Sequence, residues 1–111
     1  MRTALLAAAM VLAMAGAAEV SLRNSTGGWD IHEVYIVPVS SDQWGDNLLG
    51  ESVMTEGGVY TSELPPGLYS MRAVDEDGDE YERSPALVTT DFVWEITLSD
   101  LEGYSSSGSA G

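Results

Sequence analysis

The feature that most constrains this chain is a two-residue alternation of apolar and polar side chains, in short runs that turn residues interrupt. Val20 and Leu22 alternate with polar neighbours, and residues 92–98 repeat the pattern with four apolar side chains on one face. Gly, Pro, Asn and Asp separate such runs at roughly eight to twelve residues, and no stretch keeps a helical period. Side chains alternate between the two faces of a β-strand. The pattern therefore predicts an all-β domain over residues 19–100, with about seven strands in a two-sheet antiparallel β-sandwich.

Turn chemistry within residues 68–83 predicts the register of one hairpin. A three-residue loop that ends with Gly78 in the left-handed conformation places Ala73 opposite Tyr81 and Arg72 opposite Glu82. Apolar side chains then share one face and opposite charges share the other. A two-residue turn would instead place Glu82 opposite Ala73, so we choose the three-residue loop.

The strand expected at residues 31–39 is nearly continuous in Val, Ile and Tyr, and its alternation slips between Ile31 and Val34. This slip predicts a β-bulge, and Pro38 is expected to end the strand's hydrogen-bond ladder. Two further short strands are expected around residues 52–54 and 59–62. The predicted core consists of Val20, Leu22, Ile31, Val34, Ile36, Leu48, Leu64, Tyr69, Met71, Ala73, Tyr81, Phe92, Trp94, Ile96 and Leu98.

Residues 1–18 have the pattern of a secretory signal peptide. One Arg precedes an apolar run, and small residues follow that run up to Glu19. We expect cleavage after Ala17 or Ala18, because the run is shorter than the roughly 18 to 20 residues that a membrane helix needs. The mature chain is then periplasmic or secreted, without a membrane anchor. The Gly- and Ser-rich residues 101–111 are expected to form a disordered tail.

The charge balance is strongly acidic, with 18 Asp and Glu against four Arg and no Lys. Without residues 1–18 the net charge is 3 − 18 = −15. Such a charge disfavours nucleic acid and favours cations and basic partners. The chain has no Cys and a single His, His32. Few nucleophile and base pairs can therefore be assembled, and we expect neither catalysis nor a bound organic cofactor.

Two resemblances rest on particular residues. Residues 58–72, with Leu64-Pro65-Pro66-Gly67-Leu68-Tyr69 between two strands, resemble the corner of transthyretin-like sandwiches such as carboxypeptidase regulatory-like domains. More of the chain resembles a group of small exported proteobacterial proteins of unknown function. The matching positions are Asn24, Thr26, Gly27, Ile31, Tyr35, Pro38, Trp44-Gly45, Leu48-Leu49-Gly50 and residues 71–78. The resemblance implies a transthyretin-like or immunoglobulin-like sandwich and brings no catalytic residue.

Two tryptophans in expected loops, Trp29 and Trp44, are candidate ligand-binding residues, together with Asp46. Exposed aromatic rings beside Gly and Asp suit a sugar- or peptide-binding edge. Alternatively, each ring caps an open end of the sandwich. We expect a monomeric binding or accessory module for an unknown protein or cell-envelope ligand, with a carbohydrate-binding module as the alternative.

The expected hairpin also places Asp75 opposite Asp79, with Asp77 between them, so that three carboxylates share one turn. Like charges opposite one another are destabilising, and Ca²⁺ would relieve the repulsion with oxygen ligands. A weak calcium site is therefore one hypothesis for Asp75, Asp77 and Asp79. The other is that a solvated turn simply prefers Asp and Gly.

Overall fold

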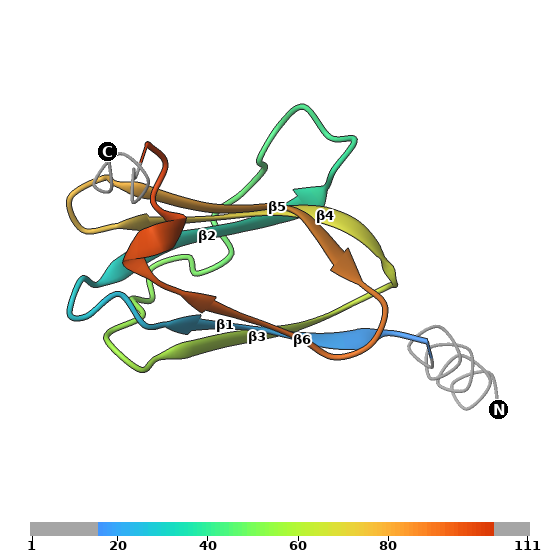
Figure 1. Cartoon of the computed structure of the whole chain (residues 1–111), viewed down its shortest axis with the longest axis horizontal. Coiled ribbons are helices and arrows are strands. Elements are labelled where there is room, and N and C mark those ends of the chain that lie inside the picture. The colour runs from blue at the N-terminus through green and yellow to red at the C-terminus, as the bar shows by residue number, and fades with distance from the viewer. Residues whose placement is uncertain (1–15, 104–111) are drawn as a thin grey trace, which may run out of the picture.

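The computed structural model describes residues 16–103, in which two three-stranded sheets pack face to face (Figure 1). One sheet has the order β3-β1-β6 and the other β2-β4-β5. The strands are β1 (Ala18–Asn24), β2 (Ile31–Pro38), β3 (Val59–Leu64), β4 (Gly67–Asp75), β5 (Glu80–Val88) and β6 (Phe92–Ile96), followed by the 3₁₀ helix η1 (Leu98–Asp100). The predicted all-β, two-sheet sandwich is confirmed.

The strand count and one strand direction differ from the prediction. Six strands form, and residues 52–54 make only an isolated bridge in which Met54 exchanges both backbone hydrogen bonds with Ile31. The pair β1 and β6 is parallel, while the other three pairs are antiparallel. The chain changes sheets after β1, β2, β3 and β5, so β6 enters beside β1 by a crossover rather than a hairpin.

The predicted hairpin register is confirmed. Arg72 lies opposite Glu82 and Ala73 opposite Tyr81. Gly78 has a φ of 83°, and its N–H donates to the carbonyl of Asp75 at 2.9 Å. Only glycine adopts that conformation without steric cost, which is why the loop has three residues and the register follows.

Three further turn and strand features match the sequence pattern. The register of β2 shifts between Ile31 and Glu33, so the predicted bulge is present, and Pro38 is the last residue of β2. The expected corner carries the chain from β3 in one sheet to β4 in the other. There the Tyr69 hydroxyl donates to the carbonyl of Pro65 at 2.6 Å. This bond closes the corner over the end of the core.

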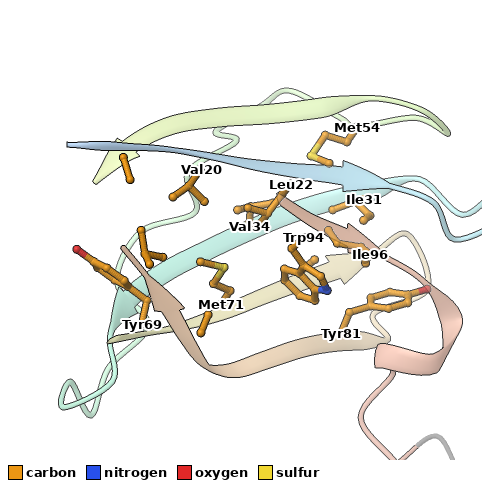
Figure 2. Close-up of a cluster of buried hydrophobic side chains, with 14 residues drawn as sticks. Val20, Leu22, Ile31, Val34, Met54, Tyr69, Met71, Tyr81, Trp94 and Ile96 are labelled. Atoms are coloured by element: carbon orange, nitrogen blue, oxygen red, sulfur yellow. The ribbon is translucent and has the colours of Figure 1, made fainter. Parts of the chain in front are cut away.

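The core lies between the two sheets, where buried side chains of β1, β2, β4, β5 and β6 meet (Figure 2). Tyr60 and Leu64 of β3 are partly buried and pack against it. Most of the predicted core residues are buried, and Trp94 and Tyr81 are the largest fully buried side chains. Four buried apolar residues were not predicted: Ala18, Met54, Ala86 and Val88. Met54 reaches the core only because its segment bridges to Ile31, which no local pattern indicates.

Two predicted core residues, Leu48 and Leu98, are exposed by 42% and 41%. The backbone of Leu48 returns to β2, where its N–H donates to the Val34 carbonyl, but the side chain of the next residue, Leu49, packs on the core. Leu98 misses the core because β6 ends at Ile96 and η1 replaces the strand alternation. Both predictions were therefore wrong about the side chain.

One buried polar group holds the turn before β2 in place. Asn24 is completely buried, and its Nδ2 donates to the carbonyls of Trp29 and Met54, each at 2.8 Å. Its Oδ1 accepts from the backbone N–H and the hydroxyl of Thr26. Because all of these groups are satisfied, the burial of Asn24 fixes the backbone that leads into β2.

The described domain extends slightly beyond the predicted boundaries. Ala18, which the sequence assigned to the leader, begins β1 opposite Leu64. Leu101, assigned to the tail, makes an isolated bridge with Tyr81 and packs against the core. Most of the predicted leader, residues 1–15, and of the tail, residues 104–111, lies outside the described residues. No helix among residues 16–103 has the length and apolarity to cross a membrane.

Candidate functional site

The outer face of the β2-β4-β5 sheet carries a hollow of 460 Å³. The loop between β2 and β3 folds back over this face and supplies one of its walls. The ionisable and aromatic groups in the lining are Glu33, Tyr35, Trp44, Asp46, Arg72 and Glu80. The hollow therefore combines aromatic surface with charge, as ligand sites commonly do.

Strand alternation and register place the sheet residues of the hollow. Val34 points into the core, so its neighbours Glu33 and Tyr35 face outward. Tyr35 pairs with Arg72 of β4, which in turn pairs with Glu82 of β5. These three outward side chains form one row across the sheet.

The loop that carries Trp44 is anchored on the free edge of β2 by Asn47. The Oδ1 atom of Asn47 accepts from the N–H of Val34 at 3.0 Å, and its Nδ2 donates to the carbonyl of His32 at 3.1 Å. The Leu48 N–H also donates to the Val34 carbonyl. These bonds occupy backbone groups that an edge strand would otherwise leave unpaired, and they hold the loop against the sheet.

Trp44 and Arg72 pack together in the wall of the hollow. The Arg72 Cζ atom lies 4.5 Å from the centroid of the Trp44 ring, and the Tyr35 ring lies 6.3 Å from Trp44 at an interplanar angle of 54°. The guanidinium also lies 3.6 Å from a carboxylate oxygen of Glu80 and 3.9 Å from one of Glu82. Ion pairs at such partly exposed positions contribute little stability, but together with the cation–π contact they restrict where Arg72 points.

Negative charge around the hollow exceeds the positive charge. Glu33, Asp46 and Glu80 face one Arg72, a balance of 1 − 3 = −2. The Tyr35 hydroxyl donates to a Glu33 oxygen at 2.5 Å, and this bond raises the pKa of Tyr35. Beside the hollow, a hydrogen bond with the carboxyl group of Glu102, together with burial, raises the pKa of Glu82. The local electrostatics therefore favour an additional cation.

The structure brings together two of the three predicted ligand-binding residues. Trp44 and Asp46 both line the hollow, and Trp44 lies on the outer face of a sheet rather than over an open end of the sandwich. Trp29 is 40% exposed in the turn before β2 and does not line the hollow. The sequence did not predict that Tyr35 and Arg72 belong to the site. Their outward positions on the strands follow from local alternation, but the register between β2 and β4 that brings them together does not.

The predicted calcium ligands are arranged differently from the expected convergence. Asp75 is buried, and its Oδ1 accepts from the backbone N–H groups of Asp77 and Asp79 at 2.9 and 3.0 Å. Its Oδ2 accepts from the Tyr81 hydroxyl at 2.8 Å. The side chains of Asp77 and Asp79 are exposed at the tip. In this arrangement Asp75 organises the turn, and burial and this carboxylate raise the pKa of Tyr81.

A second hollow of 370 Å³ lies between the segment before β3 and β3 itself. Six of the nine residues that line it are apolar by type, and Leu48, Val53 and Val59 are among the exposed apolar side chains of the domain. None of the residues that line it is Asp, Glu, Arg or His. Because it offers no charged group, the first hollow is the stronger candidate for specific binding.

Comparisons of the chain with protein-family models, with curated proteins and with solved structures found no match. The resemblance to small exported proteobacterial proteins therefore stays a prediction. The fold defines the class of the domain as a β-sandwich, a class that carries many unrelated functions.

Proposed function

We propose that this chain is an exported, non-catalytic binding module whose hollow on the β2-β4-β5 face receives a basic side chain of a protein or cell-envelope partner. The observation that carries the proposal is the joint presence, in one hollow, of a fixed aromatic and guanidinium wall and three carboxylates. The leader-like residues 1–18 support export. The lack of Cys and Lys and the single His support a binding role over catalysis.

The carboxylates and the two aromatic rings of the hollow each have a role in this proposal. The carboxylates of Glu33, Asp46 and Glu80 accept hydrogen bonds from an ammonium or guanidinium group, and charge-assisted bonds of this kind are stronger than neutral ones. Trp44 and Tyr35 pack against the aliphatic stem of that side chain. The net charge of the chain attracts basic partners over longer distances, mainly raising the association rate.

The test compares capture of a basic peptide by variants with equal charge. An arginine-rich decapeptide is titrated into the protein and followed by tryptophan fluorescence. The double variant Asp46→Asn, Glu80→Gln removes two charges from the hollow, and the control Glu19→Gln, Glu51→Gln removes two exposed charges elsewhere. We expect the first variant to weaken binding about tenfold or more, and the control to weaken it by about threefold or less.

Equal weakening in the two variants would mean that the peptide responds only to net charge, and the proposal would fail. A pull-down from the cell envelope with the same pair of variants then identifies the natural partner. We expect the control variant to capture this partner and the Asp46→Asn, Glu80→Gln variant to lose it.

The second candidate function is carbohydrate binding, and the observation that favours it is the aromatic surface that Trp44 and Tyr35 present beside carboxylates. Sugar rings pack on aromatic faces and their hydroxyls donate to carboxylates. A glycan array probed with the protein and with Trp44→Ala tests it. Binding that Trp44→Ala abolishes and Trp29→Ala preserves would favour a glycan, since Trp29 lies outside the hollow.

A further inference from the structure

We propose that Asp30, His32 and Glu76 form a binding site for a divalent transition metal ion of the zinc class. Each of these residues offers one ligand atom, and the three atoms lie within 4.8 Å of one another. The site is separate from the hollow, and neither proposal depends on the other. It lies at the end of the sandwich where β2 begins and where the β4–β5 turn lies (Figure 1).

The sheet register brings the three residues to one side. Ile31 and Asp75 pair with each other and are both buried. Their neighbours Asp30 and Glu76 therefore lie opposite each other and outward, and the Glu76 N–H donates to the Asp30 carbonyl at 2.8 Å. The ligand atom of His32 lies within 4.8 Å of those of Asp30 and Glu76, so its side chain is on the same side as theirs.

The β2 bulge is at His32. The pairing passes from Ile31 with Asp75 directly to Glu33 with Val74, which leaves His32 as the extra residue without a partner across the ladder. Bulges of this kind redirect a side chain and are frequent beside functional sites. Here the bulged residue is the single histidine of the chain.

Polar side chains hold the backbone at or beside all three positions. The Asn24 amide donates to the carbonyl of Trp29, just before Asp30, and the Asn47 amide donates to the carbonyl of His32. The buried Asp75 carboxylate organises the turn that begins at Glu76. A ligand set on fixed backbone loses little conformational freedom when it binds an ion.

The three side chains themselves are uncommitted in the described part of the chain. None of them forms a side-chain hydrogen bond there, and both ion pairs found within residues 16–103 involve Arg72. Among residues 16–103, two carboxylates thus lie close together with no Arg paired to either. A divalent cation would neutralise both charges at once.

The donor set selects the class of ion. Zinc takes imidazole nitrogen and carboxylate oxygen at about 2.0 to 2.2 Å, commonly with three protein ligands and one open position. The imidazole favours zinc and its neighbours over Ca²⁺ and Mg²⁺, which prefer all-oxygen sites. Tetrahedral ligands at that distance are about 3.4 Å apart, so modest side-chain rotation within the 4.8 Å cluster completes the set.

The experiment titrates ZnCl₂ into the protein, produced without a histidine tag, by calorimetry. His32→Gln removes the nitrogen ligand and keeps both carboxylates, while Glu51→Gln removes an exposed charge outside the cluster. We expect one zinc ion per chain, affinity reduced tenfold or more in His32→Gln, and a change of less than about threefold in Glu51→Gln. Loss of a second-sphere partner already costs about tenfold, so loss of a ligand should cost at least that.

A second measurement needs no variant. Because His32 is the single histidine, its imidazole resonances are unambiguous, and they should shift with saturating zinc and not with the same concentration of Ca²⁺. Three results would each overturn the proposal: no one-to-one binding at millimolar zinc, equal affinity in His32→Gln, or unshifted imidazole resonances. Equal and competing affinity for Ca²⁺ would also overturn it, since it would indicate a general attraction of cations to the acidic surface.

Discussion

Replacing Asp75 by alanine should destabilise the domain more than any other single change at the β4–β5 turn. The substitution removes three hydrogen bonds that the carboxylate accepts. Two of the donors are backbone N–H groups of exposed turn residues, and each such bond contributes about 0.5 to 1.5 kcal/mol. The third donor is the hydroxyl of the buried Tyr81, and leaving it unsatisfied costs about 1 to 3 kcal/mol.

The sum is about 2 to 6 kcal/mol, against a total stability of about 4 to 13 kcal/mol for a domain of this size. Asp75→Asn keeps an oxygen for the two N–H donors, and the Tyr81 hydroxyl can rotate to accept from the new amide. We therefore expect Asp75→Asn to lower the free energy of unfolding by less than half of the amount that Asp75→Ala lowers it. Urea unfolding followed by tryptophan fluorescence measures all three proteins.

Tyr81→Phe completes a double-mutant cycle with Asp75→Asn, and the coupling should be about 0.5 to 3 kcal/mol if the hydroxyl and the carboxylate interact as described. A loss below about 1 kcal/mol for Asp75→Ala, or equal losses for alanine and asparagine, would refute the assignment of Asp75 as the organiser of the turn. The melts are repeated with EDTA and with Ca²⁺. If the role of Asp75 is only structural, each variant should lose the same free energy of unfolding with EDTA as with Ca²⁺.

Three other outcomes are expected. Trp94→Ala should cost about 3 to 5 kcal/mol in urea melts, because the indole is fully buried, and a loss below about 1 kcal/mol would contradict its place in the core. Gly78→Ala should cost about 1 kcal/mol or more, since alanine is strained at a φ of 83°, whereas an unchanged melting temperature would mean that the turn relaxes. Burial and the Asp75 carboxylate raise the pKa of Tyr81, so the folded state keeps a proton that the unfolded chain loses above about pH 10. The free energy of unfolding should then fall by about 1.4 kcal/mol for each pH unit above 10, and less steeply in Tyr81→Phe. An equal slope in both proteins would contradict this expectation.

The sequence by itself determined the elements that depend on neighbouring residues. Alternation over residues 92–98 and the slip at Ile31 are local patterns, and they predicted the last strand and the bulge. The hairpin register was also local, because Gly78 allows one loop geometry and that geometry sets every pair up to Arg72 and Glu82. The candidate ligand residues Trp44 and Asp46 were found in the same way, from their loop composition.

Only the tertiary structure decided which distant segments meet. The parallel pairing of β1 with β6, the burial of Met54 and the exposure of Leu48 depend on how the two sheets close over the core. The hollow needs the register between β2 and β4, which puts Arg72 beside Tyr35, and the metal cluster needs the same register at Asp30 and Glu76. Such pairings are selected by the burial of side chains far apart in the chain, and a local period specifies a strand's two faces without specifying its neighbour.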